Sequence, residues 1–313
     1  MRRLTTMRES HLLSHIFARS ANLAAAFPQV LLGPGDDCAV VRTGSGDQVL
    51  LKVDQVVEGR HFAPETPVDL IARKAIARAV SDIAAMAGMP AWGMAAAVIP
   101  EGFAHADELF DRTAHWARHF GAPLVGGDIS SGAPGSALTL SIAIGGTPAP
   151  GRGPVLRSGA QTGDEVWVTG KIGGSLASGR HLTFEPRLRE GRWLADTLGP
   201  DLHAMIDVSD GLGRDAGRVA ERSGVRVVIE GSRVPLHADV DYVHVGVADG
   251  EDYELLFCCS PGVMERALAT AGGRAPPPAT PFTRIGHVVT GSGCALALPE
   301  GRNLNAKEMG WDH

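Results

Sequence analysis

Carboxylates recur in this 313-residue sequence where apolar runs begin or end. Six of them are candidates for one acidic site: Asp37, Asp54, Asp82, Asp128, Asp207 and Asp210. Carboxylates held together at the rim of a sheet repel one another unless a cation lies between them, and Mg²⁺ prefers such hard oxygen ligands. Magnesium with open positions for phosphate oxygens supports phosphoryl transfer from ATP. The spacing therefore makes a magnesium-dependent phosphoryl-transfer site one candidate.

These acids also have simpler structural interpretations. Asp after Gly is common in turns, as in GPGDDC at residues 33–38. Asp82 could form a surface pair with Arg78, one helical turn earlier. Ser209 or Asp210 could cap the helix that follows, although a cap does not also explain Asp207. On these residues alone, both the structural and the metal-binding interpretations stay open.

Charge and hydropathy exclude several classes of partner. The formal net charge is −6 and no basic tract stands out, which argues against a nucleic-acid surface but not against anionic substrates whose charge metal ions offset. No apolar run approaches the ~20 residues that span a bilayer. The N-terminus has no apolar signal core, and the four cysteines show no CxxC spacing. We therefore expect a cytoplasmic protein that binds small molecules, with no nucleic acid and no membrane.

Hydropathy predicts the elements that position the acids of the first half. Short apolar runs predict strands at residues 39–41, 49–53, 94–99, 124–128 and 138–144, and helical periodicity predicts helices at residues 8–26, 68–88 and 104–120. Asp54 and Asp128 are each expected at or directly after the end of a strand. His115 and His119 have metal-ligand spacing, but they fall on the polar face of their helix, so we interpret them as solvent-facing.

The second half follows a Gly- and Pro-rich stretch at residues 145–153, which predicts a linker there. Strands are predicted at residues 165–169, 225–230, 255–259, 285–289 and 295–298, and another ends at Asp207 before a helix that reaches about residue 222. The glycine-rich segment 170–175 could bind phosphate at a helix N-terminus, although it lacks the P-loop spacing.

Seven sequence blocks together carry a family resemblance. In order, they are GDDCAVV, VDQVVEGRHF, KAIARAVSDIAAMAGMP, LVGGD, LRSGAQTGDEVWVTG, IDVSDGLGRDAGRVAERSGV and GEDYELLF. They cover nearly the whole chain, which resembles the bacterial thiamine-monophosphate kinase family within the aminoimidazole ribonucleotide synthetase superfamily. The resemblance implies ATP-dependent phosphorylation of thiamine monophosphate to thiamine diphosphate, with Mg²⁺ as cofactor and direct in-line attack by the substrate phosphate.

The resemblance also implies an architecture. We expect an α/β fold, α+β-like in layout, with two domains that are each a mixed β-sheet with helices packed on one face. Residues 1–150 would form a metal- and ATP-binding dimerisation domain, and residues 151–313 would complete the ATP and substrate site. The family further implies a homodimer whose N-terminal domains pair, with the site between the two domains and near the dimer seam.

Site residues follow by position from the same resemblance. Mg²⁺ would be held by Asp37, Asp54, Asp82, Asp128, Asp207 and Asp210, with the backbone carbonyl of Val53. Asp37, Asp54 and Asp210 would be central to catalysis. ATP would contact Phe110, Gly127, Asp128, Arg157 and Ser209, and thiamine phosphate would contact His61, Glu251 and Trp311. The aromatic plane of Trp311 suits a cationic thiazolium ring.

The chain departs from the family pattern at the metal site. The family usually has two hydroxyl residues before the aspartate at position 54, where this chain has Lys52 and Val53. The lysine could replace one metal ion with a fixed charge, or it could point to solvent. Other departures are Ala79 for Asn, and Ile129-Ser130-Ser131 where Thr-Thr is frequent. Phe110 stands where the aromatic residue is often Tyr.

Other interpretations of residues and function remain. His61 could pack at a strand end, Arg157 could be a surface cation, and Trp311 could cover the edge of a core. The chain could also be another ATP-using member of the superfamily with a different acceptor. A third hypothesis is a paralogue that binds nucleotide or thiamine phosphate without turnover.

Overall fold

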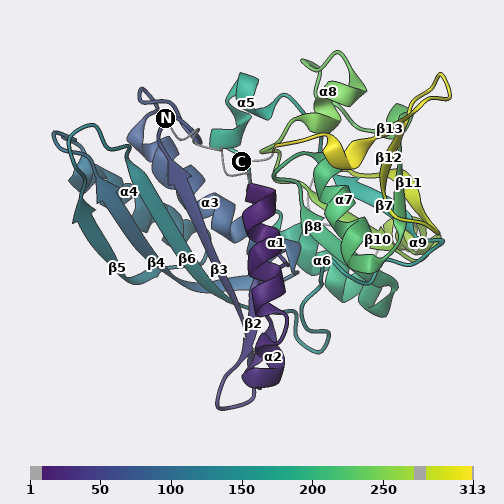
Figure 1. The fold of residues 1–313 in the computed structure, drawn as a ribbon, viewed down its shortest axis with the longest axis horizontal. Coiled ribbons are helices and arrows are strands. Elements are labelled where there is room, and N and C mark those ends of the chain that lie inside the picture. Colours follow the sequence, from purple (N-terminus) through teal and green to yellow (C-terminus); the bar gives the residue numbers. More distant parts are fainter. Residues whose placement is uncertain (1–8, 271–279, 312–313) are drawn as a thin grey trace, which may run out of the picture.

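The computed structural model describes residues 9–270 and 280–311, and two mixed β-sheets organise them (Figure 1). The first sheet has six strands in the order β1-β2-β3-β6-β4-β5. Only β4 and β5 pair in parallel within it. Its elements and their companions are α1 (Glu9–Ser20), α2 (Leu23–Ala26), β1 (Val30–Leu32), β2 (Ala39–Arg42), β3 (Gln48–Val57), α3 (Val68–Ala85), β4 (Met89–Ile99), α4 (Ala106–His119), β5 (Leu124–Ser131) and β6 (Thr139–Thr147).

The second sheet has seven strands in the order β13-β12-β9-β11-β7-β10-β8, with β9 and β12 parallel. Its elements are β7 (Glu165–Thr169), α5 (Ser175–Ser178), α6 (Leu188–Leu198), β8 (Leu202–Asp207), α7 (Leu212–Ser223), β9 (Arg226–Glu230), α8 (Val243–Ala248), β10 (Leu255–Cys259), α9 (Val263–Thr270), β11 (Phe282–Val289), β12 (Gly293–Ala297) and β13 (Asn303–Asn305). Two mixed sheets with packed helices confirm the predicted fold class.

The first sheet has one helix-covered face and one outer face. Successive residues of a strand point to opposite faces, so Lys52 and Asp54 lie on the side of α3, whereas Val53 points outward and is 66% exposed. Asp54 is not at a strand end as expected, because the pairing of β3 with β6 continues to Val57. Asp128 likewise lies inside β5, which reaches Ser131.

The second sheet differs from the expectation of helices on one face. Alternate residues of its strands enter two separate cores: Leu256 and Cys258 of β10 pack with the core that contains α7, whereas Leu255 and Phe257 pack with the core that contains α6. All five residues of β10 are buried, as they are in β7. A strand without alternation is typical of a sheet covered on both sides.

Helix α3 connects the two sheets. Its apolar side, which includes Ile76, Val80 and Ile83, is buried against the first sheet. It also packs against α6 and β8 of the second sheet. Packing against both sheets therefore fixes the polar residues of α3 in place.

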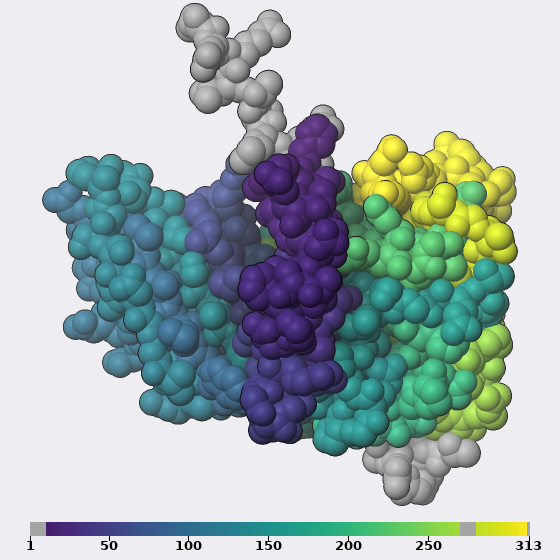
Figure 2. All heavy atoms as spheres, turned by 60° about the horizontal axis from the view of Figure 1, so that its bottom comes forward, coloured from purple at the N-terminus to yellow at the C-terminus, as the bar shows by residue number. Residues whose placement is uncertain are grey.

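Helix α1 lies over the junction between the two halves of the chain (Figure 2). The predicted helix 8–26 is broken, because turn residues 21–22 separate α1 from α2; Arg8, its expected first residue, is outside the described residues. Phe17 of α1 stacks under the guanidinium of Arg222 in α7 at 5.5 Å. Within residues 9–270 and 280–311, no helix has the length and hydropathy needed to cross a membrane.

Candidate active site

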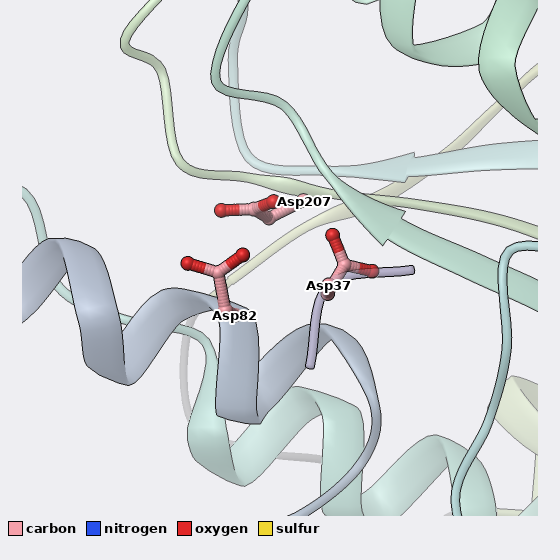
Figure 3. A group of neighbouring side chains, drawn as sticks. All are labelled: Asp37, Asp82 and Asp207. Atoms are coloured by element: carbon pink, nitrogen blue, oxygen red, sulfur yellow. The ribbon is translucent and has the colours of Figure 1, made fainter. Parts of the chain in front are cut away.

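Three buried carboxylates from separate elements converge on one point (Figure 3). Asp37 lies in the loop before β2, Asp82 lies in α3, and Asp207 is the last residue of β8; one oxygen of each is within 4.8 Å of the others. We call these residues the three-acid group. Among the described residues, Asp37 Oδ2 is buried without a hydrogen-bond partner. Three convergent oxygens, one of which lacks a donor, fit a divalent cation that prefers oxygen, such as Mg²⁺.

Burial and repulsion disfavour ionisation of this group. Burial, followed by the charge of Asp37, raises the pKa of Asp207 to about 7. Burial also raises the pKa of Asp82 well above its usual range, against the opposing charge of Lys52. The hydroxyl of Ser81 donates to Asp207 Oδ2 at 2.6 Å. A bound cation would stabilise the ionised carboxylates, so cation binding should release protons.

Lys52 and Asp54 lie directly beside the three-acid group. Lys52 Nζ donates to Asp82 Oδ1 at 2.6 Å and lies 3.4 Å from Asp54 Oδ1. Arg78 Nε approaches Asp54 Oδ2 at 3.9 Å. The interpretation of Asp82 as the surface partner of Arg78 is therefore wrong, because Asp82 is 5% exposed and pairs with Lys52. The interpretation of Lys52 as a solvent-facing lysine is wrong for the same reason.

Arg157 neutralises the other end of the three-acid group. Its Nε donates to Asp37 Oδ1 at 3.1 Å, and its backbone N–H donates to Asp36 Oδ2 at 3.1 Å. Burial opposes the charge of Arg157, but Asp37 outweighs it and raises the pKa of the guanidinium. Arg157 is thus not a surface cation. If a metal ion were bound by the three-acid group, an anion bound to that metal ion would lie close to the guanidinium of Arg157.

Asp215 fixes the conformation of the loop between β8 and α7 through hydrogen bonds to its backbone. This fully buried carboxylate accepts the backbone N–H groups of Ser209 and Asp210 through Oδ2, both at 3.0 Å. Arg218 donates to Asp215 at 2.6 Å and pairs with Asp210 at 2.5 Å. The interpretation of Ser209 or Asp210 as the helix cap is wrong, because Gly211 is the N-cap residue and no side chain caps α7.

A buried lysine joins two of the residues expected at the substrate site. Lys74 is 0% exposed, and its Nζ donates to the backbone carbonyl of His61 at 2.6 Å and pairs with Glu251. It also contacts His181 Nδ1 at 2.7 Å. Burial would raise the pKa of Glu251, but the hydrogen bond of His181 and the charge of Lys74 lower it to about 2. His61 Nδ1 accepts the backbone N–H of Val57 at 3.0 Å.

Backbone contacts place Trp311, the remaining residue expected at the substrate site, near the loop that carries Glu251. The N–H of Trp311 donates to the carbonyl of Asp210 at 3.0 Å, and the N–H of Glu251 donates to the carbonyl of Ser209 at 2.7 Å. Gly250 lies between these loops, so close that a Cβ there would be 2.9 Å from Trp311 Cδ1. The Trp311 side chain is 47% exposed. Trp311 is therefore half-exposed and lies against the loop that carries Gly250.

Phe110, Gly127 and Asp128 are not part of this arrangement within one chain. They line a separate hollow of about 410 Å³ at the edge strand β5. Pairing places Asp128 level with Gln55, through Ala96 and Ser141, and therefore on the outer face of the sheet, opposite Asp54. Three strand steps separate β3 from β5, or about 14 Å. The three-acid group and Asp128 of the same chain are thus not ligands of one ion.

The glycine N–H groups of the segment 170–175 are already hydrogen-bonded within the protein, since that of Gly170 donates to the carbonyl of Pro281 at 2.9 Å. The N–H of Gly173 donates to both carboxylate oxygens of Asp252 at 3.0 Å, and that of Gly174 donates to Asp249 at 2.8 Å. His115 and His119 are exposed on α4, as expected. Within the described residues, the only cluster of His, Cys, Asp and Glu side chains with metal-binding geometry is the three-acid group.

Comparison with curated proteins decides the family. The chain is 33% identical over 304 residues to the thiamine-monophosphate kinase of Rhodopirellula baltica, a match that covers 91% of this chain and 90% of the relative. It belongs to the thiamine-monophosphate kinase family. The enzyme of that name from Escherichia coli K12 is 32% identical over 323 residues, which covers 91% of this chain and 92% of the relative.

Family and structure comparisons agree on the fold. The family model "AIR synthase related protein, N-terminal domain" matches residues 35–147, which include β2 to β6. A solved structure described as AaThiL complexed with AMPPCP and TMP is similar to this chain with a TM-score of 0.74 and 26% identity, over 99% of both chains. The chain is thus an enzyme of the thiamine-monophosphate kinase family, with the fold of this superfamily.

Sequence reasoning missed several residues that the site contains. Lys74, Arg78, Ser81 and Asp82 are spaced i, i+4, i+7 and i+8, and they form a polar stripe on an otherwise apolar helix. That stripe was the available signal for Lys74 and Ser81. No comparable signal marks His181, because its contact with Lys74 spans 107 residues.

Proposed function

We propose that this protein transfers the γ-phosphoryl group of ATP to thiamine monophosphate, which forms thiamine diphosphate and ADP. The supporting observation is the three-acid group, which fits a divalent cation, in a chain similar over its full length to a protein complexed with AMPPCP and TMP. Relatives named thiamine-monophosphate kinase cover the same length of chain.

The acids would allow an acidic protein to bind the anionic ATP, because they would hold Mg²⁺ next to its phosphates. Asp37, Asp82 and Asp207 would hold Mg²⁺, with Asp54 and Asp210 at the margins of the site and the carbonyl of Val53 as a further oxygen. When bound, Mg²⁺ supplies positive charge to the phosphate oxygens. Arg157 would contact the ATP phosphates, and Ser209 would approach them from the loop before α7. The buried carboxylates then serve binding rather than proton transfer.

The reaction needs no nucleophile from the protein. An oxygen of the substrate phosphate would attack the γ-phosphorus in line, while the bond to the β,γ-bridging oxygen breaks and ADP leaves. The task of the chain is to orient the two phosphates. His61 and Glu251, connected by Lys74, would position thiamine monophosphate, and Trp311 would cover its ring.

We further propose a cytoplasmic homodimer whose N-terminal domains, residues 1–150, pair through the outer face of the first sheet. Apolar side chains on that face are a third to two-thirds exposed: Leu51, Val53, Met94 and Val98. A contiguous exposed apolar surface of this kind favours association. Residues 151–313 would complete the ATP and substrate site. Phe110, Gly127 and Asp128 would contact ATP from the second subunit, near the dimer seam that the family pattern implies.

The test is to incubate the purified protein with ATP, Mg²⁺ and thiamine monophosphate, and to separate thiamine phosphates by chromatography. We expect thiamine diphosphate with wild type and at least a 100-fold lower rate, on the order of a lost transition-state charge contact, with Asp210→Asn. Asp196→Asn, at an exposed i,i+4 pair with Arg192, is the matched control. ATP hydrolysis without thiamine diphosphate would indicate a different acceptor, and nucleotide binding without turnover would indicate a binding protein.

A further inference from the structure

The positive group between Asp54 and Asp82 is a side chain of the protein, the ammonium group of Lys52. Lys52 Nζ is 2.6 Å from Asp82 Oδ1 and 3.4 Å from Asp54 Oδ1, and the lysine side chain is 20% exposed. We propose that the ammonium group of Lys52 replaces one divalent cation at this site, so that the chain binds one metal ion fewer than it would with an uncharged residue 52. This inference rests on the proposed function, because it concerns the metal ions of that reaction.

The position of Lys52 is set by the sheet rather than by its own flexibility. It lies on the helix-covered side of β3, between Leu51 and Val53, which point outward and are 42% and 66% exposed. From that side it extends to α3, where its Nζ donates to Asp82. Asp54, two residues further along the same strand, points the same way. The two carboxylates therefore hold the ammonium group from two elements.

A second cation could not share this position. A metal ion that bridges Asp54 and Asp82 would lie at ligand distances of about 2.1 Å from their oxygens. It would then be within a few ångströms of Nζ in a poorly solvated site, where repulsion between like charges is strong. The neighbouring guanidinium of Arg78, whose Nε is 3.9 Å from Asp54 Oδ2, adds to the repulsion. Lys52 thus occupies this position alone.

The other part of the acid cluster remains open to a metal ion. Asp37 Oδ2 is buried without a partner among the described residues, and Asp207 has Ser81 as its side-chain donor. Neither carboxylate is hydrogen-bonded to Lys52. The substitution therefore lowers the number of metal ions and does not abolish metal binding. The fixed charge of the Lys52 ammonium group thus replaces the charge of a metal ion, whose binding would depend on the metal concentration.

The test counts bound metal directly, without turnover. Mn²⁺ would be titrated into wild type, Lys52→Thr and Lys52→Arg in the presence of AMPPCP, and bound equivalents would be measured by electron paramagnetic resonance. We expect one additional equivalent for Lys52→Thr, and the wild-type number for Lys52→Arg, which keeps the charge. Lys307→Thr is the matched control, since it removes an exposed lysine that pairs with Glu221. An unchanged count in folded Lys52→Thr would overturn the proposal.

A measurement on the wild type keeps the proposal testable if the variants do not fold. In crystals soaked with Mn²⁺ and AMPPCP, anomalous density should appear beside Asp37 and Asp207, and no anomalous peak should lie between Asp54 and Asp82. A metal peak at that second position, with Lys52 displaced, would contradict the proposal. Both measurements are independent of thiamine phosphate, so a protein that proves not to phosphorylate it would still give the metal count.

Discussion

Glu251 shows how surrounding charges can hold a single partly buried carboxylate ionised. Its backbone has a positive φ of 63°, a conformation that non-glycine residues rarely adopt. Lys74 and His181 fix its carboxylate from one side, and Arg78 lies 4.0 Å from its other oxygen. Strain of this kind persists only where surrounding contacts determine the geometry. Lys74 therefore fixes the position of the Glu251 carboxylate relative to the backbone of His61.

The pKa of Glu251 predicts a pH-dependent contribution to stability. Because the folded-state pKa, about 2, is below the ordinary value of 4.5, the ionised carboxylate stabilises the fold above pH 4.5, and this contribution is lost as the pH falls toward 2. We expect the difference in unfolding free energy between wild type and Glu251→Gln to shrink by about 1 kcal/mol between pH 7 and pH 3.5, as measured by urea unfolding. An equal difference at both pH values would contradict this.

The control for that measurement is Glu221→Gln. Glu221 is exposed and pairs with Lys307 at the surface, where ion pairs contribute little. Its stability difference from wild type should be small at both pH values, because the pair is exposed.

At this scale the sequence could predict which acids matter, but not their partners. Asp37, Asp82 and Asp207 could be chosen because each lies at the boundary of an apolar run or on a polar stripe. Only the family resemblance indicated that they meet, since Asp82 and Asp207 are 125 positions apart in the chain. The direction of Lys52 was open for the same reason: the strand period assigns it a face, and only packing identifies the neighbour on that face.

At the scale of elements, backbone hydrogen bonds connect the loop after β8 to the loop before β10. The carbonyls of Val208 and Ser209 accept the N–H groups of Tyr253 and Glu251 at 2.8 and 2.7 Å. The close approach requires Gly250, because a Cβ there would lie 2.6 Å from the carbonyl oxygen of Ser209. Glycine between two backbones allows a contact that any side chain would prevent.

We therefore expect Gly250→Ala to separate these loops. The variant should lose about 1–3 kcal/mol of unfolding free energy, as overpacked sites do, and its KM for thiamine monophosphate should rise because Glu251 and Trp311 shift together. Gly44→Ala is the matched control, since a Cβ at Gly44 has no heavy atom within 4 Å among its described neighbours. Unchanged stability and KM in Gly250→Ala would show that the loops do not depend on this contact.

The existence of most elements could be predicted, but not all of their ends. The helix predicted to reach about residue 222 is α7, which ends with Gly224 as its C-cap at a φ of 67°. The ends of β3 and β5 were placed too early, because the predictions stopped at Asp54 and Asp128, whereas partner strands extend the pairing. Strand length depends on neighbours, which a linear hydropathy pattern does not contain.

At the scale of the whole molecule, the two sheets differ in what covers them. The fully buried runs EVWVT and LLFCC lack the alternation of a one-sided sheet and already indicate cover on both faces. The outer face of the first sheet, by contrast, has several exposed apolar side chains within one chain, among them Val53 and Met94. The proposed homodimer would bury that face, and the proposed boundary near residue 150 separates the two sheets.

This predicts an effect of charge on assembly. Met94 of β4 is 50% exposed on the outer face, so Met94→Glu should convert a dimer into a monomer in sedimentation experiments, because association would bury an unpaired charge. Val245→Glu is the control: Val245 is 44% exposed on α8, away from the first sheet. A monomeric wild type, or a Met94→Glu variant that remains dimeric, would contradict the proposed interface.

The central claim is transfer of phosphate from ATP to thiamine monophosphate, and one labelling measurement tests it most directly. Wild-type protein would be incubated with ATP labelled at the γ-phosphoryl group, Mg²⁺ and thiamine monophosphate, and label in thiamine diphosphate would be compared with the ADP formed. We predict one labelled thiamine diphosphate for each ADP, and no labelled product when Mg²⁺ is removed by a chelator. ADP that forms while thiamine diphosphate stays unlabelled would contradict the proposed reaction.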